Sequence, residues 1–261
     1  MPSAIHPISR AARKPPSDVT IAVILAVTFA AAPLHGQEPP PDLIHKIAQK
    51  ESETQATRDQ YTYRQTVVLE ELDDRGAKKG EYREVRDVIF SPQRERLEQM
   101  VGTPKLTLQR LVLTDEDFRD IRDIQPFIFR EGQRLLYETK FRGEEKVDDV
   151  DCWVIQVRPR QILQGQRLFD GLLWASRQDF SIVRTEGQAV PQIRSLKSEN
   201  LFPKFTTLRR PVDGKHWFPA HTHADDTLYF RTGPIRVRLT IRYSNYQRFG
   251  AESSVTFKEV P

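Results

Sequence analysis

The fold is decided by the stretch IRVRLTIRYSNYQRF, residues 235–249. Apolar residues alternate with polar ones from Ile235 to Tyr243, as expected of a β-strand with one buried and one solvated face. At about 3.3 Å per residue, a strand of this length spans roughly 50 Å. Strands that long are typical of large curved sheets or barrels and not of small sandwiches. We therefore expect a large antiparallel sheet.

Other segments with the same period of two, separated by turn residues, predict further strands along most of the chain. They cover residues 61–70, 81–90, 94–101, 133–142, 147–158, 167–175, 180–188, 202–210 and 216–230. Residues 152–157 are apolar on both faces, which predicts a central strand. Because no linker divides these segments, we expect a single β domain over residues 42–261.

A helix is predicted before the strands. Asp42 can cap it, and Leu43, Ile47 and Ala48 recur on one face at helical spacing. The apolar face fades after Ala48. The sequence therefore predicts a short helix that frays near Thr57.

A second helix is predicted in mid-chain. Thr114 and Asp117 have the spacing of a capping box, and Pro126 ends the helix. The segment from Phe118 to Phe129 carries several large apolar side chains outside any predicted strand. Each such side chain gains roughly 1.5–3 kcal/mol on burial. We therefore predict that this segment is covered and forms the plug of an apolar cavity.

The chain begins with the features of an export signal. Three basic residues precede an apolar run over residues 21–32, and small residues follow. This run is too short for a spanning helix, which needs about 20 apolar residues. We predict a signal peptide over residues 1–36, cleaved before Gln37, with an uncleaved anchor as the alternative. A proline-rich spacer over residues 37–41 follows, and the mature chain is expected in the periplasm.

The composition describes a globular protein. Hydrophobic residues make up 38% of the chain, which excludes a disordered class. The single cysteine, Cys152, excludes an intramolecular disulfide framework. The formal net charge is +4, and it falls to +2 when the predicted signal peptide is removed. So small a charge, with dispersed arginines, argues against nucleic acid as a partner.

A histidine cluster is the best candidate for a metal site. His221 and His223 lie two residues apart and face the same side of a strand, and His216 precedes them. No carboxylate is spaced to orient their rings, so an unmetallated polar face is the favoured interpretation. Cys152 lies in an apolar strand, where an inert thiol is expected. We predict no catalytic residues, no metal and no cofactor.

Several short patterns resemble those of the periplasmic lipoprotein-carrier superfamily, which comprises the Lol carrier type and its outer-membrane lipoprotein-sorting relatives. They are Tyr61-Thr-Tyr63, Val150-Asp-Cys-Trp153, Gly171-Leu-Leu-Trp174, Trp217-Phe-Pro219 and the segment from Tyr243 to Phe249. The resemblance implies a mainly β (α+β) fold. In it, a strongly curved antiparallel sheet or incomplete β-barrel surrounds an apolar cavity for acyl chains, and helices plug its mouth. It also implies that the protein is not an enzyme.

We therefore predict a monomeric periplasmic binding protein for a lipid or acyl chain, acting in outer-membrane lipoprotein or lipid transport or in envelope sensing. Its other expected partner is an envelope protein or lipoprotein, and the mature chain is not expected to span the membrane. The residues predicted to line the cavity or form the plug are Tyr61, Tyr63, Val67, Leu69, Phe118, Ile121, Phe127, Phe129 and Trp174. Two alternatives remain: an exported metal-dependent hydrolase using His216, His221 and His223, and a ligand-free structural envelope module.

Overall fold

The structure is a computed structural model that describes residues 38–91, 93–194 and 199–248. The predicted signal peptide, its cleavage site and the end of the predicted last strand at Phe249 lie outside the described residues. None of the helices in the described part of the chain is long and apolar enough to cross a membrane.

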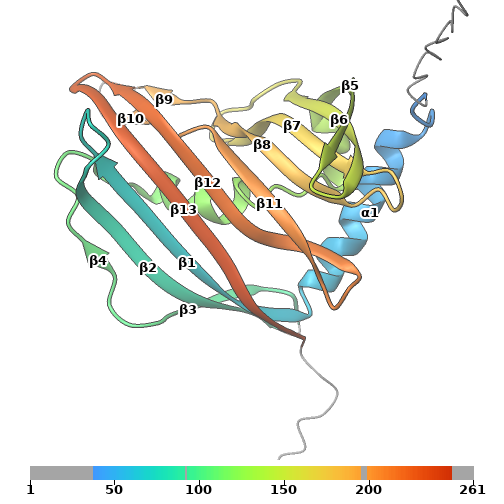
Figure 1. Cartoon of the computed structure of the whole chain (residues 1–261), viewed down its shortest axis with the longest axis horizontal. Coiled ribbons are helices and arrows are strands. Elements are labelled where there is room, and N and C mark those ends of the chain that lie inside the picture. Colours follow the sequence, from blue (N-terminus) through green and yellow to red (C-terminus); the bar gives the residue numbers. More distant parts are fainter. Residues whose placement is uncertain (1–37, 92, 195–198, 249–261) are drawn as a thin grey trace, which may run out of the picture. The chain divides into compact units, whose positions relative to one another are not determined.

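One eleven-stranded antiparallel sheet dominates the domain (Figure 1). Its strands are β1 (Tyr61–Leu72), β2 (Lys78–Phe90), β3 (Arg96–Met100), β4 (Lys105–Leu106), β5 (Tyr137–Val147), β6 (Val150–Pro159), β7 (Leu168–Ser176), β8 (Ile182–Val190), β11 (Phe205–Val212), β12 (His216–Phe230) and β13 (Gly233–Arg248). The order is β3-β2-β1-β13-β12-β11-β8-β7-β6-β5, with β4 beside β2. This order is a path and not a ring, so the sheet is an open, curved half-barrel. A separate pair joins β9 (Ile193–Arg194) to β10 (Glu199–Asn200).

The longest strands form the middle of the sheet. β13 has 16 residues and pairs with β1 on one side and β12 on the other. Its inward residues are buried from Ile235 to Tyr243, which confirms the predicted alternation. On the opposite face, Arg236 and Arg238 pair with Asp225 of β12 at 3.3 and 3.0 Å. These exposed pairs are worth little in stability, so burial of the apolar face holds the centre of the sheet together.

The helical segments lie on one side of the sheet (Figure 1). They are α1 (Leu43–Arg58), α2 (Asp115–Arg119), the π-helical turn η1 (Asp120–Ile124) and the 3₁₀ helix η2 (Glu131–Leu136). The capping box of Thr114 and Asp117 is present as predicted. Asp42 makes no side-chain cap on α1; its carboxylate pairs with Lys46 at 3.1 Å.

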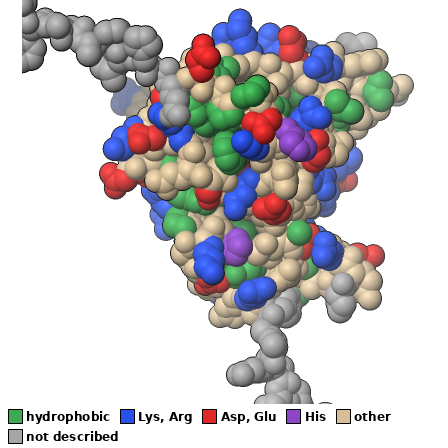
Figure 2. All heavy atoms as spheres, turned by 90° about the vertical axis from the view of Figure 1, so that its right-hand side faces the viewer, with side chains coloured by type: hydrophobic (Ala, Val, Ile, Leu, Met, Phe, Trp, Pro, Cys, Tyr) green, Lys and Arg blue, Asp and Glu red, His purple; other side chains and the backbone are tan. Residues whose placement is uncertain are grey.

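The main hydrophobic core lies between the concave face of the sheet, α1 and the segment from α2 to Phe129. A second, smaller cluster contains Cys152, Val154, Trp174 and Val183. Neighbouring residues of one strand point to opposite faces, so this cluster lies on the other face of β6–β8. Figure 2 shows that acidic and basic side chains are interspersed on the face seen from the right of Figure 1.

The predicted strand over residues 133–142 was wrong at both ends. Glu131–Leu136 is a 3₁₀ helix, and β5 begins only at Tyr137. The strand then continues through Gly143, which has a positive φ of 126° and marks a break in the register with β6. Gly143 is thus a bulge and not a terminator, because only glycine adopts such a backbone at little cost.

Candidate functional site

The residues from Phe118 to Phe129, here called the plug segment, cover the concave face of the sheet. Ile121, Phe127 and Phe129 are buried, with 4, 5 and 0% of their surface exposed. The Phe127 ring stacks on Phe169 of β7 at 4.3 Å and meets Tyr137 of β5 edge-on at 5.7 Å. The plug segment therefore belongs to the interior of the half-barrel, as the sequence predicted for its apolar side chains.

Two glycines make room for this packing. Gly171 of β7 and Gly187 of β8 lie directly opposite each other on these two paired strands. A Cβ atom would lie 2.7 Å from the Phe169 ring at Gly171 and 2.6 Å from it at Gly187. Larger residues at either position would displace the ring on which Phe127 stacks.

A buried ion pair ties the plug segment to the sheet and to α1. Arg209 of β11 contacts both carboxylate oxygens of Glu51, at 2.8 and 3.0 Å, and donates a further hydrogen bond to the Phe127 carbonyl. The Arg209 and Glu51 side chains are only 2 and 0% exposed. Because both charges are out of water, each depends on the other for compensation.

Further polar contacts hold the segment and the helical turn before it. Thr207 Oγ1 donates to the Gln125 carbonyl at 2.8 Å, and Asn200 Nδ2 donates to Asp117 at 2.8 Å. Asp120 pairs with Arg167, yet burial raises the pKa of Asp120 to about 6. The Gln125 side chain is fully buried, and its amide atoms have no hydrogen-bond partner within the described residues. The plug segment thus carries an uncompensated polar group in its buried part.

Beside the plug segment lies a cavity of about 430 Å³, here called the arginine pocket. Its walls come from α1, the β2–β3 turn, the plug segment and the first residues of β5 and β7, and so from both halves of the open sheet. Its arginines are Arg58, Arg94, Arg96, Arg122, Arg130 and Arg167, and its carboxylates are Asp59 and Asp123. Its apolar wall residues include Phe90, Ile124, Pro126, Phe127, Tyr137 and Leu168.

A larger concavity, of about 680 Å³, lies over the other face of β6–β8. Its charged lining residues are Arg142, Glu144, Glu145, Arg158, Asp170, Glu186 and Lys204. Acidic and basic groups are nearly balanced there, and the concavity does not reach the plug segment. We therefore take the smaller arginine pocket, and not the larger concavity, as the candidate site.

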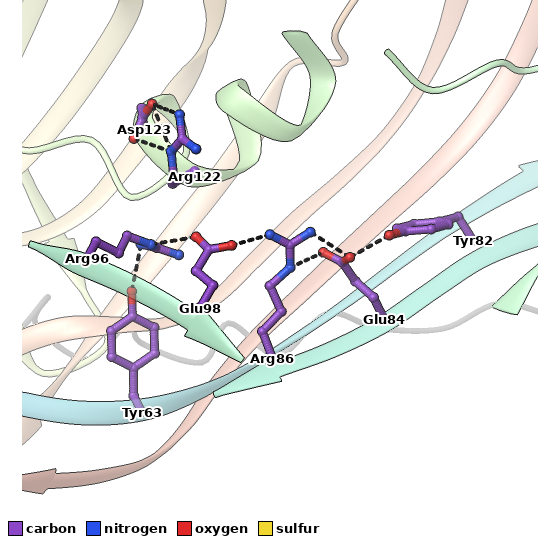
Figure 3. Close-up of polar contacts among 8 residues, drawn as sticks. All are labelled: Tyr63, Tyr82, Glu84, Arg86, Arg96, Glu98, Arg122 and Asp123. Atoms are coloured by element: carbon purple, nitrogen blue, oxygen red, sulfur yellow. Dashed lines mark hydrogen bonds and ion pairs between the residues drawn. The ribbon is translucent and has the colours of Figure 1, made fainter. Parts of the chain in front are cut away.

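One wall of the arginine pocket continues into a polar chain along β1, β2 and β3 (Figure 3). Arg96 donates to the Tyr63 hydroxyl at 3.0 Å and to Glu98 at 2.7 Å. Arg86 links Glu98 to Glu84, to which it donates through Nε at 2.7 Å. The chain ends at Tyr82, whose hydroxyl donates to Glu84. The two positive charges of Arg86 and Arg96 balance the two negative charges of Glu84 and Glu98.

The charges of this polar chain of side chains compensate one another. Burial raises the pKa of Glu98, but Arg96 and Arg86 outweigh that effect, and the net pKa lies below its usual value. Above the chain, Arg122 of the plug segment bonds to the neighbouring Asp123 at 3.0–3.2 Å (Figure 3). The carboxylates of this wall are thus already engaged by arginines.

The rest of the pocket carries unbalanced positive charge. Within the described residues, Arg58, Arg94 and Arg130 make no ion pair with a carboxylate. Asp59 lies near all three: burial raises its pKa, and the three arginines oppose that rise. One carboxylate therefore faces three cations.

The structure brings most of the predicted site residues together. Tyr63, Val67, Leu69, Ile121, Phe127 and Phe129 belong to one core, and Phe118 packs at its edge against Tyr82 at 5.7 Å. Tyr61 is buried at one end of β1, where it contacts Phe218 and donates to Asp213 at 2.6 Å. Trp174 is not brought to the same place, since it lies on the other face of the sheet and donates to Glu145.

Sequence reasoning missed the buried ion pair and the arginine pocket. Glu51 stands at helical spacing from Ile44, Ile47 and Ala48, which was a signal of an acid on an apolar face. Arg209 shares its strand face with Phe205 and Thr207, which was the matching signal. No comparable pattern marks the pocket arginines, because they come from separate segments.

The histidines do not form a metal-binding group. The His221 and His223 rings lie parallel with centroids 6.2 Å apart, whereas His216 stacks on Phe218. Burial lowers the pKa of His221, and the neighbouring His223 adds to this shift. Among the described residues, no three His, Cys, Asp or Glu side chains are arranged to hold a metal ion. That the protein binds no metal stays a prediction.

No protein-family model matches the sequence, and no curated protein does. Solved structures to which the chain is similar include a LolA superfamily protein from Nitrosomonas europaea (16% identity, TM-score 0.38, covering 82% of this chain and 97% of that one). A DUF1329 family protein from Desulfovibrio piger is similar at 15% identity and TM-score 0.38, over 84% and 98% of the two chains. An outer membrane lipoprotein-sorting protein domain from Vibrio parahaemolyticus is similar at 11% identity and TM-score 0.36, over 78% and 93%.

Proposed function

We propose that the chain is a periplasmic binding protein for a lipid or acyl chain, and not an enzyme. The ligand would occupy the concave side of the half-barrel, in the space that the plug segment fills in the closed state. The observation that carries the proposal is the plug segment itself. It fills an open sheet with large apolar side chains, and a pocket reaches its flank at Ile124 and Phe127.

The energetics of exchange favour such a role. Burial of apolar surface contributes about 25 cal/mol per Å² whether the buried group is a phenylalanine ring or an acyl chain. Part of the plug segment can therefore give way to a ligand with a small net change in free energy. The unpaired amide of buried Gln125 disfavours the closed state further, since such a group costs about 1–3 kcal/mol.

Export is the second part of the proposal. The predicted signal peptide over residues 1–36 would deliver the chain to the periplasm, where acyl chains of lipids and lipoproteins must cross an aqueous space. An envelope protein or lipoprotein is the corresponding partner, and the transport and sensing roles both require the same apolar site.

The test is a titration of the purified mature chain with the fluorescent fatty acid cis-parinaric acid. We expect saturable fluorescence enhancement that unlabelled dodecanoate reverses. Absence of enhancement at protein concentrations of about 10 μM would contradict the proposal, because affinities weaker than this correspond to less than about 7 kcal/mol of binding free energy.

A structural envelope module with a filled interior is the second candidate. It is favoured by the burial of Phe127 and Phe129, which pack into the main core on the concave side of the sheet. A module of this kind would bind neither cis-parinaric acid nor dodecanoate, so the same titration separates the two functions.

A further inference from the structure

The arginine pocket differs in charge from the larger concavity and from the face shown in Figure 2. Six arginines and two aspartates line it, whereas acidic and basic groups are mixed on the face in Figure 2 and nearly balanced in the larger concavity. The excess comes from Arg58 of α1, Arg94 of the β2–β3 turn and Arg130, which directly follows the plug segment. Such a concentration of one sign in a hollow raises the local concentration of anions.

Two arginines of the pocket, Arg58 and Arg96, each have a buried nitrogen without a hydrogen-bond partner. Arg58 is more than nine-tenths buried, and its Nε atom has no hydrogen-bond partner. One terminal nitrogen of Arg96 is likewise buried without a partner. A buried donor without a partner costs free energy, so these groups are either destabilising or set for an acceptor that comes from outside.

Part of the wall of the same pocket is apolar. Phe90, Ile124, Phe127 and Leu168 line it, and each belongs to the main core. A ligand whose anionic group is held by the arginines could therefore place its remaining atoms against this apolar wall, at the flank of the plug segment. The chemistry that fits is an anionic group joined to an apolar chain.

We propose that the arginine pocket binds the anionic head, a phosphate or carboxylate, of an amphiphile whose chain enters beside the plug segment, with Arg58, Arg94 and Arg130 as the ligating cations. This inference rests on the proposed function, which it extends by naming the class of ligand. Arginine suits the task because its planar donors bond phosphate and carboxylate oxygens in pairs.

The experiment compares four probes on the mature chain: dodecyl phosphate, dodecanoate, dodecan-1-ol and inorganic phosphate. Each competes against cis-parinaric acid, and the direct binding of inorganic phosphate is followed by calorimetry. Dodecan-1-ol has the same chain without the charge, and inorganic phosphate has the charge without the chain. We expect the two anionic amphiphiles to bind at least about tenfold more tightly than either reference probe.

The double variant Arg94→Gln/Arg130→Gln tests the residues. Arg94 is exposed and Arg130 half-buried, so the fold does not depend on either. The matched control Arg75→Gln/Arg242→Gln removes the same charge from exposed positions outside the pocket. We expect the first variant to lose about tenfold in affinity for dodecyl phosphate and to keep its affinity for dodecan-1-ol, and the control to change neither.

The outcomes separate the two proposals. If dodecan-1-ol binds as tightly as dodecyl phosphate, or if both double variants behave alike, the head-group site is wrong while acyl-chain binding stands. If inorganic phosphate matches dodecyl phosphate, the pocket is a site for free anions and the amphiphile is wrong. If no dodecyl compound binds at all, both the head-group site and the proposed function fail.

Discussion

Arg209 and Glu51 are the residues whose separate loss should cost the domain most. Neither side chain reaches solvent, and Arg209 also holds the carbonyl of Phe127. We expect Arg209→Met to lower the free energy of unfolding by about 3–5 kcal/mol, because it leaves the Glu51 charge buried without a partner. Urea denaturation at pH 7 measures the change.

The double substitution Glu51→Leu/Arg209→Met is the control for this prediction. Replacing both charges by apolar groups of similar size removes the uncompensated charge. The double variant should therefore be more stable than Arg209→Met alone. A single variant that loses less than about 1 kcal/mol would show that the pair is not buried in the way described.

Asp120 should make stability depend on pH in an uncommon direction. Burial raises its folded-state pKa from 3.8 to about 6, so the folded state holds the proton to a higher pH than the unfolded state does. The resulting stabilisation is complete below pH 3.8 and is lost as the pH rises through about 6. It is worth roughly 2–3 kcal/mol, at about 1.4 kcal/mol for each pKa unit.

Comparison with Asp120→Asn isolates this effect, because the other carboxylates titrate in both proteins. The unfolding free energy of the parent, minus that of the variant, should fall between about pH 4 and pH 7. A difference that stays constant or rises over that range would mean that Arg167 keeps Asp120 ionised throughout.

At the scale of single residues, buried positions and local caps could be predicted from the sequence, whereas polar contacts between distant residues could not. The alternation in β13 and the capping box of Thr114 depend on neighbours within a few positions, and both are present. The bond between Arg209 and Glu51 joins residues 158 positions apart. Such a contact depends on the pairing of distant strands, which one sequence does not reveal.

At the scale of the elements, we predict how the plug segment affects stability and ligand uptake. The pair of substitutions Phe127→Ala and Phe129→Ala should each lower stability by up to about 3–5 kcal/mol. If the segment competes with ligand for the same surface, both should also raise the uptake of cis-parinaric acid. Thermal melting and dye titration on the same samples give the two quantities.

The control for the plug segment is Val154→Ala/Val183→Ala. Both valines are buried in the second cluster, on the other face of the sheet. This variant should lose stability without gaining dye uptake. Phenylalanine variants that lose stability while dye binding stays negligible would identify the segment as an ordinary core element.

Element types were predicted more reliably than element boundaries. The hairpin of β7 and β8 and the hairpin of β11 and β12 appear where turn residues separated two alternating runs. The start of β5 was misplaced because residues 133–136 have a composition compatible with either a strand or a 3₁₀ turn. Its end was misplaced because Gly143 forms a bulge, which a single sequence does not distinguish from a turn.

For the whole molecule, export is the first prediction. The apolar run over residues 21–32, preceded by basic residues, should direct cleavage between Gly36 and Gln37. N-terminal sequencing of the chain recovered from a bacterial periplasm should therefore begin at or within a few residues of Gln37. Recovery of a chain that still begins with Met1 would favour the uncleaved anchor.

The arginine pocket is a feature of the whole molecule that could not be predicted from the sequence. Its cations stand at positions 58, 94 and 130, in segments whose order along the chain says nothing of their proximity. They meet because the end of α1, the β2–β3 turn and the residues after the plug segment line the same cavity. In the sequence alone, these arginines look like the other dispersed surface charges.

Mass spectrometry of the lipids that co-purify with the chain, when it is made in a bacterial periplasm, tests most directly whether the half-barrel binds an anionic amphiphile. We expect an acyl-chain compound with an anionic head, present in near-stoichiometric amount and depleted in the Arg94→Gln/Arg130→Gln variant. An empty lipid extract from a folded protein that also fails to bind cis-parinaric acid would contradict this expectation.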